Sequence, residues 1–294
     1  MLKFLLKAMR PKQWAKNVFV FAGLFFDARA FQLQPLLKSC IAFATFCLIS
    51  SAMYLINDLV DMEKDRLHPV KRLRPIASGA LPPPTALVAA GLILAVTIPA
   101  AFLLDTAFGL VAIVYAALMI VYSLVLKKIV IIDVMTVAAG FVLRVFAGSA
   151  VVRVTRFSPW LYVCTTLLAL FIAINRRRNE LVVLADCANS HRASLEEYNL
   201  PLLDDMNSLV TAATLVSYSF YTFSAPNTPN NHAMMLTIPF VVYGIFRYLY
   251  LLRIKNLGGA PEEILLGDRP FLISLLLWAL TAAMVIYSPI VPDW

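Results

Sequence analysis

Apolar runs of about 20 residues recur along the whole of this chain, and they restrict how it can fold. A helix of that length spans the hydrocarbon core of a bilayer. Charged residues make up only 14% of the sequence, whereas soluble domains carry roughly a quarter. The sequence therefore predicts an all-α, polytopic membrane bundle surrounded by lipid.

Pro, Gly and charged residues divide these runs into about nine predicted membrane helices within one domain, residues 1–294. The first of them is interrupted by Lys16, Asn17 and Asp27. The predicted spans are 14–31, 36–56, 85–104, 106–126, 130–152, 159–175, 207–224, 233–252 and 271–289. Two long polar segments, 57–84 and 176–206, each follow an apolar helix on the same predicted side.

The distribution of Lys and Arg predicts the orientation. Most of the 25 cations fall on one side of the predicted bundle, together with the N-terminus and both long polar segments. By the positive-inside rule this side is cytoplasmic. The C-terminus is therefore expected on the outer side of the cell (inner) membrane. Anionic lipid facing these loops also accounts for the net charge of +8, and no nucleic-acid partner is predicted. The four cysteines form no C-x-x-C pair, so no disulfide framework or zinc site is indicated.

A concentrated run of charge begins at the end of the second predicted helix. If that run is helical, Asn57, Asp58, Asp61 and Asp65 share one face, where like charges repel. A divalent cation removes this repulsion, and hard oxygen ligands suit Mg²⁺, which also binds substrate phosphates. The simpler alternative is a solvated helix end whose carboxylates pair with neighbouring cations. We predict a Mg²⁺–diphosphate site at the membrane surface.

Cations follow this acidic run directly, beyond Pro69. Lys71, Arg72 and Arg74 would suit a phosphate-rich substrate, because Arg offers bidentate geometry to phosphate. The alternative is that they only set the topology. The same two interpretations apply to Arg176 and Arg177, and Lys127 is ambiguous because a short inner loop tends to be basic.

The fifth predicted helix carries a polar stripe that includes Asp133 and Arg144. Ionisable residues within a membrane usually face a bundle interior or a wet cavity. The two lie roughly 16 Å apart along a helix, so each needs another partner. Asp133 is the better site candidate, whereas Arg144 could contact substrate or pair with a carboxylate elsewhere. Lys16 and Asn17 lie further into the first span than a membrane anchor requires.

The motif Asn57-Asp58-x-x-Asp61-x-x-x-Asp65, followed by Arg72-x-Arg74-Pro75-Ile76-Ala77-Ser78-Gly79, resembles the signature of the UbiA superfamily of intramembrane prenyltransferases. The likeness extends through the helical plan to the whole chain. Aromatic prenyltransferases of that superfamily carry a second D-x-x-x-D pattern after the sixth helix. No acids in 176–206 have that spacing, so this sequence departs from the aromatic branch.

Other motifs resemble the decaprenyl-phosphate phosphoribosyltransferase branch. They are Arg10-Pro11-x-Gln13-Trp14-x-Lys16-Asn17, His68-Pro69-x-Lys71-Arg72-x-Arg74-Pro75, Tyr122 with Lys127, Arg144-x-x-Ala147-Gly148, Arg176-Arg177-x-x-Glu180-Leu181 and Ser194-Leu195-Glu196-x-Tyr198. A lipid monophosphate and a sugar 5-phosphate would call for more Arg, Lys and Tyr and fewer Asp.

The resemblance implies that phosphoribosyl pyrophosphate donates its 5-phosphoribosyl group to a polyprenyl phosphate. On this reading Asp58, Asp61 and Asp65 are catalytic and hold Mg²⁺ with Asn57. The predicted substrate and phosphate contacts are Lys16, Asn17, Lys71, Arg72, Arg74, Tyr122, Lys127, Asp133, Arg144, Arg176, Arg177, Glu180 and Tyr198. An aromatic prenyltransferase and a lipid-phosphate transporter are the alternatives. Prenyl chain length and a homo-oligomeric state are left open.

Overall fold

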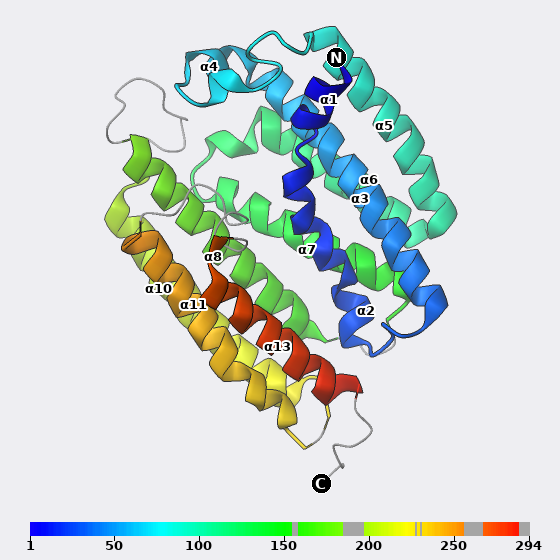
Figure 1. The fold of residues 1–294 in the computed structure, drawn as a ribbon, viewed down its shortest axis with the longest axis vertical. Helices are drawn as coiled ribbons and strands as arrows, with labels where there is room; N and C mark the ends of the chain where they lie inside the picture. Colours follow the sequence, from blue (N-terminus) through cyan, green and yellow to red (C-terminus); the bar gives the residue numbers. More distant parts are fainter. Residues whose placement is uncertain (155–157, 185–196, 227, 230, 256–266, 288–294) are drawn as a thin grey trace.

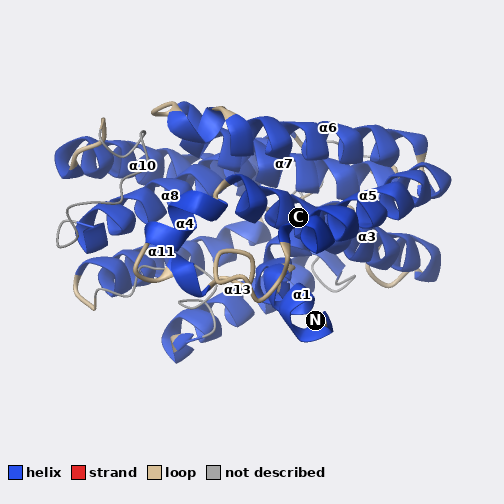
Figure 2. Ribbon diagram, turned by 90° about the horizontal axis from the view of Figure 1, so that it is seen from above, coloured by secondary structure: helices blue, strands red, loops and turns tan. Residues whose placement is uncertain are grey.

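The structure is a computed structural model that describes residues 1–154, 158–184, 197–226, 228–229, 231–255 and 267–287. All regular structure in these residues is helical (Figures 1 and 2). Its elements are α1 (Leu2–Ala8), η1 (Pro11–Phe21), α2 (Ala22–Phe26), α3 (Leu33–Val60), α4 (Met62–Leu67), η2 (Lys71–Leu73), α5 (Pro83–Leu104), α6 (Thr106–Leu124), η3 (Leu126–Lys128), α7 (Ile132–Val152), α8 (Pro159–Leu184), α10 (Leu200–Ser224), η4 (Ala233–Thr237), α11 (Ile238–Arg253) and α13 (Arg269–Tyr287).

Seven of the described helices are long and apolar enough to cross a membrane, by length and composition. The chain is therefore an integral, multi-pass membrane protein. α10 was also predicted as a span, and it is 25 residues long. It falls outside those seven because polar residues such as Asn207, Thr211 and Thr214 lower its hydropathy.

The first predicted span, 14–31, is wrong as a single helix. Residues 11–21 instead form a 3₁₀ helix, and the α-helix that continues it ends at Phe26. A 3₁₀ run of this length is unusual. Asn17, fully buried in η1, binds side chains of α3 and α7, so one face of the segment packs against the bundle while Val18 on the other is exposed.

Two other helices extend further toward the predicted cytoplasmic side than the sequence indicated. α3 continues through Asn57 and Asp58 to Val60. α8 continues to Leu184, so that Arg176, Arg177 and Glu180 lie on a helix instead of in a loop. Asn57 and Asp58 of the acidic motif, and Arg176, Arg177 and Glu180, therefore lie on the ends of long helices. Residues Ser194, Leu195 and Glu196 of the second motif lie outside the described residues.

The helices pack in two groups joined by α7. One group contains α3, α5 and α6, and its shared core includes Phe46 and Phe108. The other contains α8, α10, α11 and α13. α7 packs against α6 on one side and α8 on the other, and η1 and α2 lie along it (Figure 1). Side chains of α7 can therefore meet partners from both groups.

A glycine permits the close contact between α7 and η1. Gly148 of α7 lies so near the backbone of η1 that a Cβ atom at this position would overlap the carbonyl group of Val20. Any larger residue would force the two elements apart. This approach sets the distance between α7 and the segment that carries Asn17.

The surface of α5 matches a lipid environment. Leu87, Leu92 and Val96 are each more than 60% exposed. Such a broad apolar face would be an aggregation hazard in water, whereas in a bilayer it is the expected outer surface. The cations of α4 and the segment after it lie at the end of the molecule that also carries the N-terminus (Figure 1); they are Lys64, Arg66, Lys71, Arg72 and Arg74.

Candidate active site

The acidic motif lies where α3 ends and α4 begins. Asp58 and Asp65 are almost completely buried, and one guanidinium nitrogen of Arg74 lies between them. Arg74 Nη1 is 3.2 Å from Asp58 Oδ1 and 2.5 Å from Asp65 Oδ2. Arg10 adds a second cation to Asp58 at 2.5 Å. The two carboxylates are thus brought together around a shared positive charge.

Asn57 and Asp61 belong to a second group of contacts. Lys127 of η3 donates to Asp61 at 2.5 Å and to Asn57 at 3.3 Å, and its own side chain is buried. α3 ends at Val60, and Asp61 has a non-helical ψ of 1°. The expected single face of four oxygen ligands is therefore divided between two sets of cations.

The positions of these carboxylates determine how a metal ion could be held. Among the described residues, no three His, Cys, Asp or Glu side chains converge as a protein-only metal cage would require. Mg²⁺ needs less than that, because one or two carboxylates together with substrate phosphates normally bind it. The Asp58–Asp65 pair has hard, buried oxygen donors, so it fits such a shared site.

The segment after α4 places cations beside this pair. Lys71 and Arg72 lie in η2, with Lys71 half-buried and Arg72 exposed. The turn is held by His68, whose Nδ1 accepts the backbone N–H groups of Val70 and Lys71 at 3.1 and 3.3 Å. Burial, followed by the charge of Lys71, lowers the pKa of His68, in keeping with a neutral imidazole that accepts these bonds.

Burial also affects the carboxylate of Asp65. Desolvation raises the pKa of Asp65 above its ordinary value, and the ion pair with Arg74 opposes that rise. A second cation close to Asp65 would favour the ionised form further. The site is therefore better suited to binding positive charge than to keeping a bare carboxylate.

A second polar cluster joins α7 to α8. Arg177 donates to Asp133 and to Glu180, each at 2.5 Å, and reaches the Tyr122 hydroxyl at 3.3 Å. Tyr198 donates its hydroxyl to Asp133 at 2.8 Å. Asp133 and Arg177 are both buried, which supplies the partner that Asp133 was predicted to need.

The protonation of Tyr198 and the exposure of Arg176 determine how this cluster could bind an anion. Burial raises the pKa of Tyr198, whose hydroxyl also accepts the backbone N–H of Ile131 at 2.7 Å. Tyr198 therefore remains a neutral donor at physiological pH. Arg176, one residue before Arg177, is exposed and lies 3.4 Å from Glu180, which leaves it accessible to a soluble anion.

Arg144 lies deeper, on α7, and is buried. It donates to Asn17 Oδ1, to the carbonyl oxygen of Gly140 and to the Tyr115 hydroxyl, each at 2.7 Å. Its guanidinium also lies over the rings of Tyr115 and Phe141. All these partners are neutral, and the structure describes no carboxylate pairing with Arg144. The alternative of a structural ion pair is thus not what the described residues show. Lys16, which was also predicted as a substrate contact, is half-buried on η1.

Sequence reasoning missed Tyr54 and Tyr115. Tyr54 lies one helical turn before Asp58, with its ring under the Arg10 guanidinium at 5.1 Å. It lies within electrostatic range of Arg144 and Arg176 as well. The sequence did contain a signal for Tyr54. Its side chain carries a hydroxyl and lies four residues before Asp58, and residues four apart share a helix face. Nothing in the sequence linked Tyr115 of α6 to Arg144.

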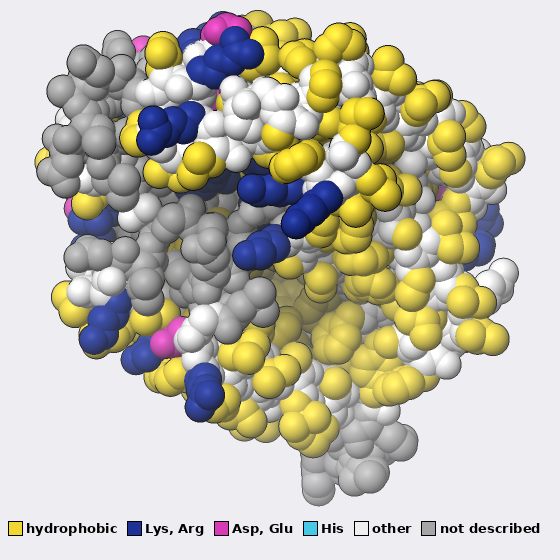
Figure 3. Space-filling view, turned by 45° about the horizontal axis from the view of Figure 1, so that its top comes forward, with side chains coloured by type: hydrophobic (Ala, Val, Ile, Leu, Met, Phe, Trp, Pro, Cys, Tyr) yellow, Lys and Arg dark blue, Asp and Glu magenta, His cyan; other side chains and the backbone are white. Residues whose placement is uncertain are grey.

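Figure 3 shows Lys and Arg side chains gathered around a hollow in the face that carries this end of the bundle. Residues 17–266 match the UbiA prenyltransferase family. The chain belongs to this family. It is therefore a membrane-embedded transferase, and the resemblance seen in its motifs is confirmed.

Curated relatives in this family cover nearly the whole chain. A decaprenyl-phosphate phosphoribosyltransferase of Corynebacterium glutamicum is 33% identical over 96% of this chain and 86% of its own length. The enzyme of the same name from Mycolicibacterium smegmatis is also 33% identical, over 96% of this chain and 92% of its own.

Solved structures of the family show the same fold. A UbiA homolog from Archaeoglobus fulgidus bound to GPP and Mg²⁺ aligns with a TM-score of 0.73 at 19% identity, over 96% of this chain and 99% of its own. The same homolog bound to Cd²⁺ aligns with a TM-score of 0.70 at 18% identity, over 96% and 99%. Divalent metal ions are thus bound by structural neighbours of this chain.

Proposed function

We propose that this protein transfers the 5-phosphoribosyl group of phosphoribosyl pyrophosphate to a polyprenyl phosphate of the decaprenyl type, releasing diphosphate. The likeness to decaprenyl-phosphate phosphoribosyltransferases over 96% of the chain carries the proposal. The geometry supports it, because Arg10, Arg74 and Lys127 surround the acidic motif. Arg176 of α8 also lies within electrostatic range of Tyr54, one turn before Asp58. Two anionic substrates would need that much positive charge.

The Asp58–Asp65 pair is proposed to hold Mg²⁺ together with oxygens of the donor diphosphate. When bound, the ion would neutralise charge on the leaving diphosphate. Arg10, Arg74 and Lys127 already contact the aspartates of the motif. We infer that these cations also bind diphosphate oxygens, with Lys71 and Arg72 added from η2.

The acceptor oxygen of a polyprenyl phosphate is already anionic, so attack on the ribose requires no general base. Arg177 would act as a donor to phosphate oxygens, and Tyr198 would do so by moving its one hydroxyl hydrogen bond from Asp133 to the phosphate. Arg144 is proposed to supply positive potential deeper in the bundle, where its neutral partners leave its charge uncompensated. Direct attack predicts inversion at the anomeric carbon.

Offering the two donors separately to the purified protein tests this function. With Mg²⁺, phosphoribosyl pyrophosphate and a polyprenyl phosphate, mass spectrometry should detect a lipid heavier by one phosphoribosyl group. Nuclear magnetic resonance of the product should show the inverted anomer. Product from a prenyl diphosphate and an aromatic acid would instead establish an aromatic prenyltransferase. Movement of the lipid phosphate across vesicles without covalent change would establish a transporter.

The proposed orientation places the N-terminus and the active site at the cytoplasmic face of the inner membrane. The phosphoribosyl donor is soluble, and this face would give it access. Alkaline phosphatase fused after Trp294 should be active, because that enzyme works only outside the cytoplasm. A fluorescent protein that folds only in the cytoplasm should stay dark at the same position. The reverse pair of results would overturn the orientation.

A further inference from the structure

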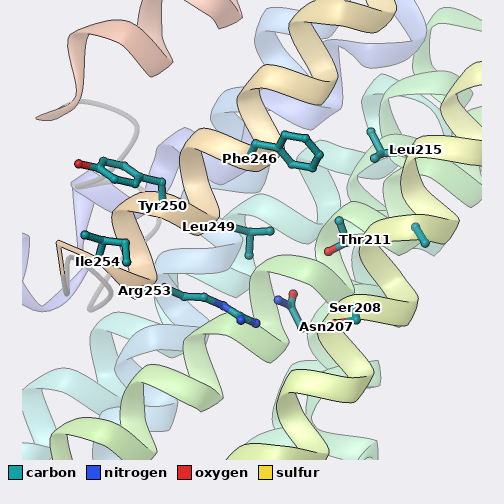
Figure 4. Close-up of a pocket in the computed structure, with 10 residues that line it drawn as sticks. Asn207, Ser208, Thr211, Leu215, Phe246, Leu249, Tyr250, Arg253 and Ile254 are labelled. Carbon is teal, nitrogen blue, oxygen red and sulfur yellow. The ribbon is translucent and has the colours of Figure 1, made fainter.

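A groove remote from the acidic motif runs between α10 and α11. It has a volume of about 540 Å³ and is open on one side (Figure 4). Its polar end is formed by Asn207, Ser208, Thr211 and Arg253, and its other lining residues include Leu215, Phe246 and Leu249. The groove is therefore amphipathic along its length.

Thr211 indicates that the groove is built for a polar group. Its side chain is 9% exposed, and its buried hydroxyl oxygen has no hydrogen-bond partner among the described residues. Neighbouring hydroxyls on the same helix behave differently. Ser208 donates to the carbonyl oxygen of Asp204 at 2.9 Å and Thr214 to that of Val210 at 2.7 Å. The Thr211 oxygen instead points into the space between the helices (Figure 4), and leaving such a group unsatisfied costs free energy.

The surroundings identify the kind of occupant. α11 belongs to a candidate membrane span, and Phe246 and Ile254 are 58% and 66% exposed. The groove therefore opens to the bilayer, where lipid is the available ligand. Arg253 ends α11 at the polar end, and Asp204 accepts bonds from both Arg253 and Arg178, at 2.9 and 2.8 Å.

The balance of charge there favours an anion. Arg178, Arg253 and the exposed Lys255 outnumber Asp204 and the exposed Asp205. An anionic headgroup at the polar end would meet Arg253, while its acyl chain would lie along Leu215, Phe246 and Leu249. We propose that the groove between α10 and α11 is a binding site for one anionic bilayer phospholipid.

The groove also connects to the helix that carries the site arginines. Asn207 accepts a bond from Asn175 of α8 at 2.8 Å, and both side chains are buried. Asn175 directly precedes Arg176 and Arg177. Occupancy of the groove should therefore stabilise the cytoplasmic half of α8, whichever reaction the protein catalyses.

The test uses the full-length protein in detergent, titrated with phosphatidylglycerol or phosphatidylcholine of identical acyl chains and observed by native mass spectrometry. One phosphatidylglycerol should be retained, with an affinity at least about tenfold above that for phosphatidylcholine, as expected when one charge-assisted hydrogen bond is gained. Equal affinity for the two lipids would overturn the proposal.

Three variants locate the site. Ala212→Leu narrows the groove and should abolish retention, whereas Ala95→Leu, an exposed alanine of α5, should not. Arg253→Gln should remove the preference for phosphatidylglycerol. Thr211→Val keeps the side-chain shape, and it should raise the lipid-free melting temperature while weakening lipid binding roughly fivefold. Retention by Ala212→Leu equal to wild type, or a change of oligomeric mass in that variant, would show that lipid does not occupy the groove.

Discussion

Arg144 and Asn17, 127 residues apart in the chain, meet inside the bundle, where Nε of the arginine donates to Oδ1 of the asparagine at 2.7 Å. The amide nitrogen of Asn17 in turn reaches Ser50 Oγ at 3.2 Å. One asparagine therefore connects η1, α3 and α7. These contacts hold the first apolar run against α3 and α7.

Replacing Asn17 by Leu should destabilise the protein by about 1–3 kcal/mol, because the buried Arg144 loses an acceptor that nothing nearby replaces. The melting temperature in detergent measures the loss. Val18→Leu changes an exposed neighbour on the same element and should leave the melting temperature unaltered. Equal melting temperatures for Asn17→Leu and wild type would show that the contact contributes nothing.

Asp58→Asn and Asp65→Asn should each abolish binding of Mg²⁺ with diphosphate, since each removes one of the paired buried carboxylates. Isothermal calorimetry with Mg²⁺ and inorganic diphosphate measures this without any turnover. Activity should fall by about 100-fold or more, corresponding to several kcal/mol. Glu63→Gln is the matched control, because Glu63 lies exposed on α4 and pairs only with Arg66 in the described contacts. Calorimetry indistinguishable between Asp65→Asn and this control would remove Asp65 from the metal site.

Tyr54→Phe should lower activity roughly tenfold while the melting temperature stays constant. The ring under Arg10 is kept, and the hydroxyl donates no hydrogen bond to the described residues, so stability has little to lose. Any effect then reports a contact with substrate. Tyr243→Phe, on the exposed side of α11, serves as the control for a generic hydroxyl loss. A fall in melting temperature without a fall in activity would contradict this role.

Asp133→Asn should destabilise the protein by about 1–3 kcal/mol, because Arg177 keeps Glu180 as a counter-charge but loses its buried partner, and Tyr198 loses a charged acceptor. Asp204→Asn removes a carboxylate that is one-third exposed, and it should cost no more than about 1 kcal/mol. Chemical unfolding of the two variants in the same detergent gives the comparison. A larger loss for Asp204→Asn would mean that the buried cluster is held by other contacts.

Asp268 provides a pH test outside the membrane spans. Its hydrogen bond with Arg247 lowers the pKa of Asp268, and the carboxylate also accepts the N–H of Phe271. A lowered folded-state pKa adds stability that is present above the unfolded value, near 3.9, and is lost as the pH falls through the folded value. Asp268→Asn should therefore melt slightly below wild type at neutral pH, and the difference should disappear under acid conditions. A constant difference at all pH values would exclude the ion pair as its cause.

The sequence predicted the helical bundle, because it follows from local periodicity. Asp58 and Asp65 were expected on one continuous helix face, whereas in the structure the helix is interrupted at Asp61 and Arg74 bridges the two carboxylates. The separation of Asp61 from them was not predictable, since it depends on where α3 ends and on Lys127, 66 residues further along the chain. Asp133 was recognised as needing a partner. Its pairing with Arg177 depends on how α7 packs against α8, which no local pattern encodes.

Helix boundaries failed for a related reason. The predicted spans ended at residues 56 and 175, before the polar ends of α3 and α8, because charge usually marks the limits of a span. In the structure these charges are satisfied by one another, so the helices can continue. The groove at α10 was also invisible in the sequence, because it is formed by residues of two helices whose packing no local pattern encodes.

Gly148 has no side chain with which to bind or catalyse anything, yet it decides whether Val20, and with it Asn17, can lie against α7. A saturation screen of this protein should therefore score Gly148 among the positions most sensitive to substitution, beside the aspartates of the acidic motif. If every sensitive position in the screen were taken as a catalytic residue, Gly148 would be misassigned. The intolerance at this position would reflect the short distance between the backbones of α7 and η1. The hydrogen bonds of Arg144 within the bundle depend on that distance.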